Sequence, residues 1–460
     1  MTATTTLALS DRLADDLVHM AQRPVESGAV LLARPARLAQ GGVRLIGVHL
    51  AEVPEGAYAH RTDRALSIPS EGFMPALRMA EDIGCVALWV HTHPALGATP
   101  EPSRNDQIVD AQLAPTFAAR TGSGLYGALT LSHRDGRLTF TGHLDGEEIS
   151  SIDRIFIAGA RLSLLRSYDS QTSDLPSLHD RHVRAFGTEI PRVLGELRVA
   201  IVGAGGTGSA VAEQLARLGV RHLTLIDPDT LSDSNLTRVY GSTPADVGRH
   251  KVDVLADHLQ RITDDMDVTR VVGTVSHQHV ARQIVGADIV FGCTDDDAGR
   301  MRLSRFSYGY LTPVIDCGIQ ISATTGGAIQ DIIGRVTVMH PGSACLICRG
   351  RVSLEIAAAQ ERSLEEQTRL AKEGYAPALP GIEPAVIAYT TATAAAAVGE
   401  LLERLVAYGP TPPPSEVLLR IHDRRLSDNH QDPTPGHYCA TENLTSFGDT
   451  DRYWGLNWLS

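Results

Sequence analysis

Two histidines and one aspartate are the first residues whose types and spacing could do chemistry. His91 and His93 come directly after the apolar segment VALWV, and Asp106 follows in PSRND. Two imidazoles and one carboxylate are the ligand set of an open catalytic zinc site, in which a fourth position is left for water. Zinc lowers the pKa of such a water and polarises a carbonyl. The sequence therefore predicts zinc-dependent hydrolysis, with Glu26 in RPVESGAVLL as the candidate general base.

This set resembles the JAMM (MPN-domain) isopeptidases, over about residues 20–145. The resemblance implies that Glu26 is the acid/base and that Ser103 stabilises the oxyanion. The implied zinc ligands are His91, His93 and Asp106. Enzymes of this family cleave after the C-terminal Gly-Gly of ubiquitin or of its bacterial relatives.

The spacing departs from the family at one point. Nine residues separate His93 from Ser103, where the family has seven. The intervening segment 95–100, ALGATP, is expected to be a loop that absorbs the two extra residues.

A glycine-rich turn is the second group of residues that could do chemistry. The apolar strand LRVAIV runs into GAGGTG, and a helical pattern opens immediately after it. The glycines let backbone amides approach phosphates at a helix N-terminus, whose dipole favours anions. They are Gly203, Gly205, Gly206 and Gly208. Asp227 closes the next strand, where a carboxylate can bind a ribose hydroxyl. This motif alone fits an NAD(P) dehydrogenase as well as an ATP-dependent enzyme.

The residues that follow the turn favour ATP. Ser234, Asn235 and Arg238 come soon after Asp227, Lys251 comes next, and the pair 295–296 (Asp-Asp) ends a later strand. A dehydrogenase has no need for an arginine, a lysine and an aspartate beside its pyrophosphate. An adenylating enzyme must neutralise a triphosphate, hold Mg²⁺ and expel pyrophosphate. No GxxxxGK[ST] segment is present, which disfavours a P-loop kinase or GTPase.

This second pattern resembles the HesA/MoeB/ThiF family, which shares its fold with ubiquitin-activating enzymes, over about residues 180–440. The resemblance implies that Asp227 binds ribose and that Asp295, with Asp296 beside it, holds Mg²⁺. The residues implied to contact the phosphates are Ser234, Asn235, Arg238 and Lys251. Arg181 and Arg184 fall where the family supplies an arginine finger from a partner subunit, which implies a homodimer.

Cysteines suggest a second, structural zinc site. Cys345 and Cys348 form a CxxC pair, which supplies half of such a site. Near the C-terminus only Cys439 is available, with His437 beside it, so the alternatives are a Cys₃His site and a lost site with free thiols.

The sequence also predicts that no enzyme thioester forms. Thioester-forming relatives place a cysteine on a loop before the last long helix, and the corresponding stretch 353–383 contains none. Cys293 and Cys317 fall in predicted strands and are expected to be packed.

The spacing of apolar segments predicts two folded modules. Residues 1–148 mix strands and helices and are expected to form an α+β domain of the JAMM/MPN kind. Residues 149–180, rich in Ser and Asp toward their end, are interpreted as a linker. Residues 181–460 alternate strands with helices, which predicts an α/β Rossmann-like domain of the ThiF/MoeB kind with a mostly parallel sheet.

Composition limits the classes of partner. Hydrophobic residues are 43% and charged residues 21% of the chain, which is typical of globular enzymes. The net charge of −13 argues against nucleic acid as a partner. There is neither a signal-peptide pattern at the N-terminus nor an apolar run long enough to span a membrane. We therefore expect a cytoplasmic protein.

Together the motifs predict a bifunctional enzyme. A zinc peptidase would trim, or remove, a ubiquitin-like or sulfur-carrier protein ending in Gly-Gly, and an ATP-dependent module would adenylate the freed glycine carboxylate. The same motifs are compatible with two alternatives. One is an NAD(P)-dependent oxidoreductase fused to a metal-binding domain, and the other is a non-catalytic scaffold that binds ubiquitin-like proteins.

Overall fold

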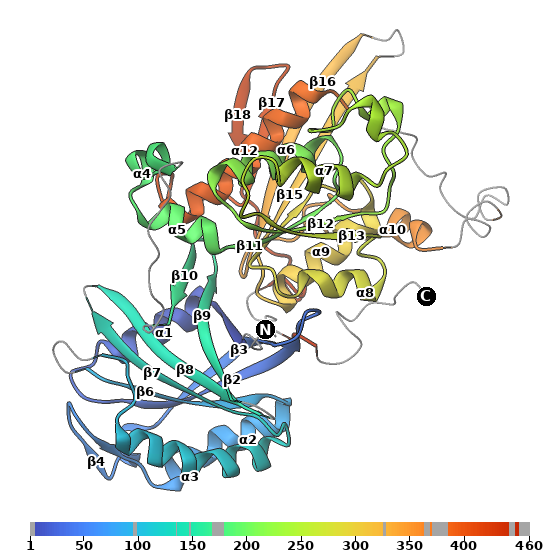
Figure 1. The fold of residues 1–460 in the computed structure, drawn as a ribbon. Helices are drawn as coiled ribbons and strands as arrows, with labels where there is room; N and C mark the ends of the chain where they lie inside the picture. Colours follow the sequence, from blue (N-terminus) through green and yellow to red (C-terminus); the bar gives the residue numbers. More distant parts are fainter. Residues whose placement is uncertain are drawn as a thin grey trace. The chain divides into compact units, whose positions relative to one another are not determined.

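The computed structural model describes residues 5–94, 99–134, 136–146, 149–167, 179–324, 328–362, 369, 385–440 and 447–449. The chain divides into two compact units (Figure 1). The first unit comprises Met1–Ser173 and Thr445–Gly455, and the second comprises Asp174–Leu444 and Leu456–Ser460. Among the helices of the described ranges, none is both long and apolar enough to cross a membrane.

The first unit is a strongly curved sheet with helices on both faces. Its strands are β1 (Thr5–Ser10), β2 (Gly28–Arg37), β3 (Val43–Glu52), β6 (Val86–Thr92), β7 (Tyr126–Arg134), β8 (Arg137–Asp145), β9 (Ser150–Ala158) and β10 (Leu162–Arg166), with a small hairpin of β4 (His60–Arg61) and β5 (Leu66–Ser67). Its helices are α1 (Asp11–Ala21), α2 (Met74–Ile83) and α3 (Arg104–Thr121). The sheet order is β1-β3-β2-β6-β7-β8-β9-β10, and β1 also pairs with β9, so the sheet closes on itself.

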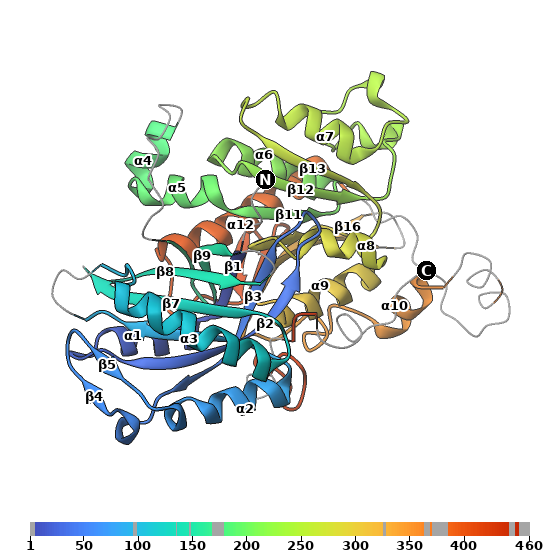
Figure 2. The same cartoon turned by 60° about the horizontal axis from the view of Figure 1, so that its bottom comes forward.

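Alternating side chains give this sheet two cores. Leu31 and Leu88 pack with residues of α1, whereas Trp89 packs on the opposite face with residues of α2 and α3. Successive side chains of a strand point to opposite faces, so one strand serves both cores. Figure 2 shows α2 and α3 running along the same side of the sheet. The end of the buried strand β6 is thereby fixed beside α3.

The strands β7 and β8 pair as an antiparallel hairpin, and β9 pairs with β8. The linker predicted over 149–180 is wrong for its first half, since β9 and β10 belong to the sheet. Apolar side chains such as Ile155 and Phe156 are buried there, and the Ser/Asp-rich end of the segment does not extend back to them.

The second unit is a sheet with helices on both faces, and its strand order is β13-β12-β11-β14-β15-β16-β17-β18. Its strands are β11 (Arg198–Val202), β12 (His222–Asp227), β13 (Asp267–Val272), β14 (Ile289–Gly292), β15 (Val314–Ala323), β16 (Ile329–Met339), β17 (Glu416–Arg420) and β18 (Arg425–Asp428). Pairings from β13 to β15 are parallel and those from β15 to β18 are antiparallel. The parallel half therefore carries the predicted strand–helix alternation, and an antiparallel extension follows it.

The helices of the second unit are α4 (Asp180–Phe186), α5 (Glu189–Glu196), α6 (Gly206–Leu218), α7 (Lys251–Leu259), α8 (Gln278–Ala281), α9 (Asp297–Gly309), α10 (Leu354–Gln360) and α12 (Ile387–Val406). Figure 1 shows α6, α7 and α12 on one face of the sheet and α8 and α9 on the other. In open α/β sheets of this kind, ligands bind at the carboxyl ends of the parallel strands, where the strand order reverses. Here that point lies between β11 and β14.

Candidate functional sites

The predicted zinc ligands of the first unit lie together. His91 is buried near the end of strand β6, His93 follows directly after the strand, and Asp106 lies in the first turn of α3. The distance from His91 Nε2 to Asp106 Oδ1 is 3.6 Å, and that from His93 Nε2 to Asp106 Oδ2 is 3.4 Å. One ligand atom from each residue lies within 4.8 Å of the others, so the three can hold a single ion.

Ser103 lies at the start of α3, close to Asp106. It is the N-cap of α3, and its Oγ accepts a hydrogen bond of 3.2 Å from the backbone N–H of Asp106. The side chain of Asp106 in turn accepts a 2.7 Å hydrogen bond from the backbone N–H of Ser103. The start of α3 therefore fixes the positions of Ser103 and Asp106 relative to each other. This holds although the nine residues between His93 and Ser103 exceed the family spacing. Of the connecting loop, residues 95–98 lie outside the described residues.

Glu26 faces the same cavity as these residues. The cavity has a volume of about 800 Å³, and Glu26 lines it together with His91, His93, Ser103 and Asp106. The side chain is buried, and burial raises the pKa of Glu26 above its usual value while the two histidines partly offset this. A carboxylate with a raised pKa beside a potential metal site is suited to act as a general base and then as an acid.

The buried nitrogens of His91 fit a metal ion. Within the described structure, neither Nδ1 nor Nε2 of His91 has a hydrogen-bond partner. A buried polar atom without a partner costs free energy, and an ion at the carboxylate of Asp106 would satisfy Nε2. His93 is oriented by the carbonyl oxygen of Thr99, which lies 3.1 Å from its Nδ1, so its Nε2 is left to bind a ligand.

The glycine-rich turn of the second unit joins β11 to α6 through very close backbone contacts. Gly203 has φ +97, and a Cβ there would lie 2.6 Å from the carbonyl oxygen of Cys293. A Cβ at Gly208 would lie 1.8 Å from the carbonyl oxygen of Gly203. Only glycine fits these two positions. Gly205 is the N-cap of α6, with no side chain over the helix N-terminus, which leaves backbone amides available to an anion.

Asp227 and Lys251 meet beside this turn. The carboxylate of Asp227, at the end of β12, accepts a 2.7 Å hydrogen bond from the backbone N–H of Ala204. Nζ of Lys251 lies 3.8 Å from Asp227 and 2.7 Å from Asp229. Burial raises the pKa of Asp227, and Lys251 counteracts this effect. Asp229 was not among the residues predicted from the sequence, although its position two residues after the end of β12 was a usable signal.

Arg238 and Asn235 approach the turn from the following loop. The side chain of Arg238 packs on Gly206, where an added Cβ would meet it at 3.2 Å, and it donates to the carbonyl oxygen of Ser234. Asn235 is buried, and its side-chain oxygen accepts from the backbone N–H of Ser232.

The acidic pair follows β14 at the same sheet edge. Asp296 is the N-cap of α9 and accepts a hydrogen bond from the backbone N–H of Gly299, whereas Asp295 is exposed. Cys293 comes directly after β14 instead of lying within it, and its carbonyl contacts the glycine turn. The structure therefore brings the turn, Asp227, Arg238 and Lys251 together with the segment that carries Asp295.

Arg181 and Arg184 lie apart from these residues. Both are on the short helix α4. His179, just before the helix, packs on Gly219, where a Cβ would lie 2.6 Å from its ring. In the described part of the chain, no hydrogen bond or ion pair joins either arginine to the glycine turn.

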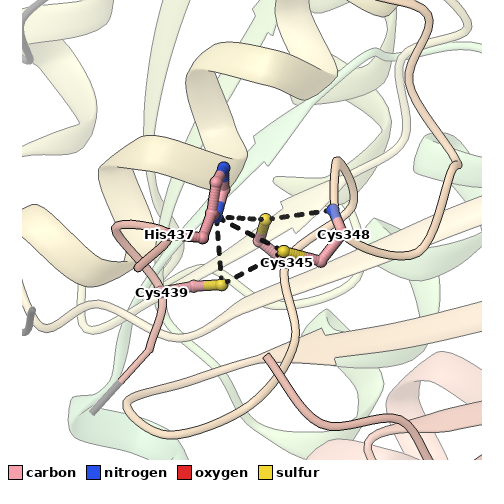
Figure 3. A group of neighbouring side chains, drawn as sticks. All are labelled: Cys345, Cys348, His437 and Cys439. Carbon is pink, nitrogen blue, oxygen red and sulfur yellow. Dashed lines mark hydrogen bonds between the residues drawn. The ribbon is translucent and has the colours of Figure 1, made fainter. Parts of the chain in front are cut away.

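Four side chains of the second unit form a compact metal-ligand group (Figure 3). Nδ1 of His437 lies 3.5 Å from Sγ of Cys345, 3.4 Å from Sγ of Cys348 and 3.2 Å from Sγ of Cys439. The Sγ atoms of Cys348 and Cys439 are 3.6 Å apart. Zinc–sulfur bonds of about 2.3 Å in a tetrahedron place neighbouring sulfurs roughly 3.8 Å apart. The four side chains fit one tetrahedral zinc ion, with His437 as the fourth ligand.

The prediction that no enzyme thioester forms falls largely outside the described residues. Of the stretch 353–383, residues 363–368 and 370–383 are among those not described. Cys317 is buried in β15, and Cys293 is half-buried.

Comparisons with known proteins concern the second unit. The model of the family described as "ThiF family" matches residues 179–434. The molybdopterin-synthase adenylyltransferase of Escherichia coli is 34% identical over 172 residues, which cover 37% of this chain and 65% of that protein. The SAMP-activating enzyme E1 of Haloferax volcanii is 30% identical over 151 residues, which cover 33% of this chain and 52% of that protein. The chain thus spans less than two thirds of the length of either relative.

A structural comparison finds the crystal structure of E. coli MccB with ATP. The sequence identity is 17% and the TM-score is 0.45, with 58% of this chain and 75% of that chain covered.

Proposed function

Since this chain belongs to the ThiF family through residues 179–434, we propose that its second unit uses ATP to adenylate the C-terminal glycine of a ubiquitin-like or sulfur-carrier protein. The observation that carries the proposal is the convergence of Lys251 and Arg238 on a glycine turn at the carboxyl edge of the parallel sheet. The two relatives are named as an adenylyltransferase and an E1, which agrees with this chemistry. Family membership also argues against the nicotinamide-dependent alternative.

Different groups of this site would bind different parts of ATP. The amides of the turn and the start of α6 would bind phosphate, and Asp227 would accept a ribose hydroxyl. Arg238 and Lys251, with Ser234 and Asn235 beside them, would stabilise the charge that develops as the glycine carboxylate attacks the α-phosphorus. The bond between the α- and β-phosphates then breaks and pyrophosphate leaves. Mg²⁺, held by Asp295 and Asp296, would neutralise part of that charge.

Two further parts of this proposal concern assembly and zinc. We propose a homodimer in which Arg184, with Arg181, reaches the phosphates of the partner copy, because α4 places neither residue at the glycine turn of its own chain. We also propose that Cys345, Cys348, His437 and Cys439 hold a structural zinc ion, which would tie the C-terminal segment to the sheet.

ATP–pyrophosphate exchange tests the adenylation. The assay would use a small carrier protein ending in Gly-Gly, with Lys251→Met as the test variant and Arg217→Met as the matched control. Arg217 is a largely exposed cation on α6 whose ion-pair partner is Glu213. We expect exchange to fall by at least a hundredfold in Lys251→Met and to be unchanged in the control. Exchange at the wild-type rate in Lys251→Met would refute the proposal.

For the first unit we propose a zinc peptidase of the JAMM/MPN kind, formed by residues 1–148 together with β9 and β10. The proposal rests on one arrangement: three metal-ligand side chains, the carboxylate of Glu26 and the hydroxyl of Ser103 line a single cavity. A Zn²⁺ ion held by His91, His93 and Asp106 would lower the pKa of a water molecule and polarise the substrate carbonyl.

The other residues of the cavity handle protons and negative charge. Glu26 would accept a proton from the attacking water and pass it to the amine that leaves when the amide C–N bond breaks. The Oγ of Ser103 accepts a hydrogen bond from the backbone N–H of Asp106. Its own hydroxyl hydrogen would therefore be free to be donated to the developing oxyanion.

Cleavage of a carrier precursor tests the peptidase. The substrate would carry a short extension after Gly-Gly, and a second substrate would join the same glycine to a lysine side chain. Glu26→Gln should reduce cleavage to a small residual rate, whereas Glu71→Gln, a change at an exposed carboxylate of the same unit, should leave it unchanged. Unchanged cleavage in Glu26→Gln would remove the basis for the assignment. The comparison of the two substrates distinguishes maturation of a precursor from removal of a modifier.

The two activities act on the same chain terminus. Trimming frees a glycine carboxylate, and adenylation activates that carboxylate. Fusion in one polypeptide raises the effective concentration of the trimmed carrier near the second site.

A further inference from the structure

Arg61 on the small β4–β5 hairpin makes an unusual set of contacts. Its side chain is only 10% exposed. Nε donates to the carbonyl oxygen of Glu26 at 2.7 Å, and Nη2 donates to Oγ of Ser27 at 2.5 Å. Nη1 donates to the carboxylate of Glu55, and the guanidinium lies over the ring of Tyr58, 4.4 Å from its centroid. The planar guanidinium therefore holds both residues of the Glu26–Ser27 peptide.

The hairpin also holds Glu26 from its other side. The backbone N–H of Glu26 donates to the carbonyl oxygen of Thr62 at 2.7 Å. Glu26 precedes β2 and belongs to no strand, so these two bonds to neighbouring hairpin residues fix its backbone. Without Arg61 the carbonyl of Glu26 would lose its partner on the hairpin.

A short path leads from this peptide to the metal ligands. The backbone N–H of Ser27 donates to Oγ1 of Thr92 at 2.9 Å, and the backbone N–H of Thr92 donates to the carbonyl oxygen of Ser27 at 3.0 Å. Thr92 lies between His91 and His93. The segments that carry the base and the two histidines are thus joined by hydrogen bonds between Ser27 and Thr92, and Arg61 binds the Glu26–Ser27 peptide from the hairpin.

We propose that Arg61 is a positioning residue that fixes the carboxylate of Glu26 relative to the metal ligands. The inference rests on the proposed peptidase function of the first unit. General bases must be held within a fraction of an ångström of the productive geometry, and a rigid, multidentate guanidinium does this better than a flexible ammonium. The hairpin that carries Arg61 also lines the cavity through residues 63–67, so the same element contacts the substrate space and the base.

Kinetics of precursor cleavage give the first test. Arg61→Gln removes the charge and most of the donors, and Arg61→Lys keeps the charge with fewer donors. We expect kcat to fall on the order of tenfold to a hundredfold in Arg61→Gln, with KM changed less than twofold, and to fall less in Arg61→Lys. The control is Arg23→Gln, which breaks an arginine–glutamate ion pair of the same unit, with Glu52, and should leave kcat unchanged.

A double variant separates positioning from general damage. If Arg61 acts through Glu26, adding Arg61→Gln to Glu26→Gln should reduce the residual rate by less than twofold. A further tenfold loss in the double variant would show that Arg61 acts by another route and would overturn the proposal.

Cobalt provides a readout that does not depend on turnover. Co²⁺ would replace zinc, and its visible absorption would report both Co²⁺ affinity and the binding of acetohydroxamate, whose acidic proton Glu26 would accept. We expect Arg61→Gln to weaken acetohydroxamate binding about tenfold, like Glu26→Gln, while Co²⁺ affinity stays within twofold. A parallel loss of Co²⁺ affinity in both Arg61 variants would indicate a merely structural role and contradict the proposal.

The results also distinguish failure of the proposed role of Arg61 from failure of the peptidase function on which that role depends. Wild-type protein that neither binds Co²⁺ at the triad nor cleaves the precursor would refute the peptidase, and the role of Arg61 with it. Wild-type protein that does both, with Arg61→Gln indistinguishable from Arg23→Gln, would refute the role of Arg61 alone.

Discussion

Ser103 and Asp106 hydrogen-bond to each other in both directions, each through its backbone N–H and the side chain of the other. This reciprocal pair is a capping box at the start of α3. It places a candidate oxyanion donor and a candidate metal ligand in a fixed relation that depends on the helix start and not on the preceding loop. The relation between Ser103 and Asp106 therefore does not depend on the length of the loop before them.

Substitutions at Ser103 should separate its two roles. Ser103→Ala should lower the free energy of unfolding by about 1 kcal/mol through loss of the cap, whereas Ser103→Gly should cost only a few tenths. Both should reduce precursor cleavage by roughly a hundredfold or more through loss of the donor. Urea unfolding and initial rates would measure these effects, with Ser103→Thr as the control that keeps the hydroxyl. Full activity in Ser103→Gly would exclude Ser103 as the oxyanion donor.

Metal analysis should find two zinc ions per chain. His91→Asn should lose one of them with little change in melting temperature. Cys345→Ser should lose the other and melt at a lower temperature, because structural zinc contributes to folding free energy. Elemental analysis with thermal denaturation would measure both, and Cys85→Ser, a change outside either group, should retain two ions. A single ion in the wild type would show that one of the groups does not bind zinc.

Stability should fall on acidification partly because of His340. This residue is buried, and burial together with the positive charges of Arg404 and Arg349 lowers the pKa of His340 to about 4. Unfolded histidine has a pKa near 6.5, so below that pH the unfolded chain takes up a proton that the folded chain refuses. Between pH 7.5 and 5 the wild type should lose about 2 kcal/mol more than His340→Asn in urea unfolding. Parallel pH dependence of the two proteins would contradict this.

Glycine substitutions should distinguish the nucleotide turn from an ordinary helix. Gly208→Ala should abolish ATP binding, because its Cβ would overlap the carbonyl oxygen of Gly203. Gly399→Ala, in the middle of α12 with open space around the new Cβ, should stabilise the protein by up to about 1 kcal/mol and leave exchange unchanged. Calorimetric titration with ATP and urea unfolding would measure the two effects. ATP binding of normal affinity in Gly208→Ala would show that the turn does not contact the nucleotide.

The sequence allowed prediction of those parts whose geometry is local. The segment VALWVHT forms β6, RVAIV forms β11, and α6 begins at the glycine turn, because apolar periodicity and glycine placement determine strands and helix starts over short distances. Membership of the ThiF family was likewise correct. Geometry also brings together His91, His93 and Asp106, whose roles remain proposals.

Features that depend on distant pairing could not be predicted in the same way. The β9–β10 segment looked like a connector, since only its pairing with β1 and β8 makes it part of the sheet. Contacts of Arg61 with Glu26 join residues on separate segments, and no spacing rule relates them. The place of His437 in the cysteine group was open for the same reason, because a histidine two residues before Cys439 comes close to the CxxC pair only when the chain returns to it.

We propose that one chain contains two chemically independent sites. The most direct measurement is to assay ATP–pyrophosphate exchange and precursor cleavage side by side in His91→Ala and Asp295→Ala, with a mature carrier supplied for the exchange assay. We predict that His91→Ala retains exchange and loses cleavage, and that Asp295→Ala retains cleavage and loses exchange. Loss of both activities in either variant, or loss of neither, would contradict the account.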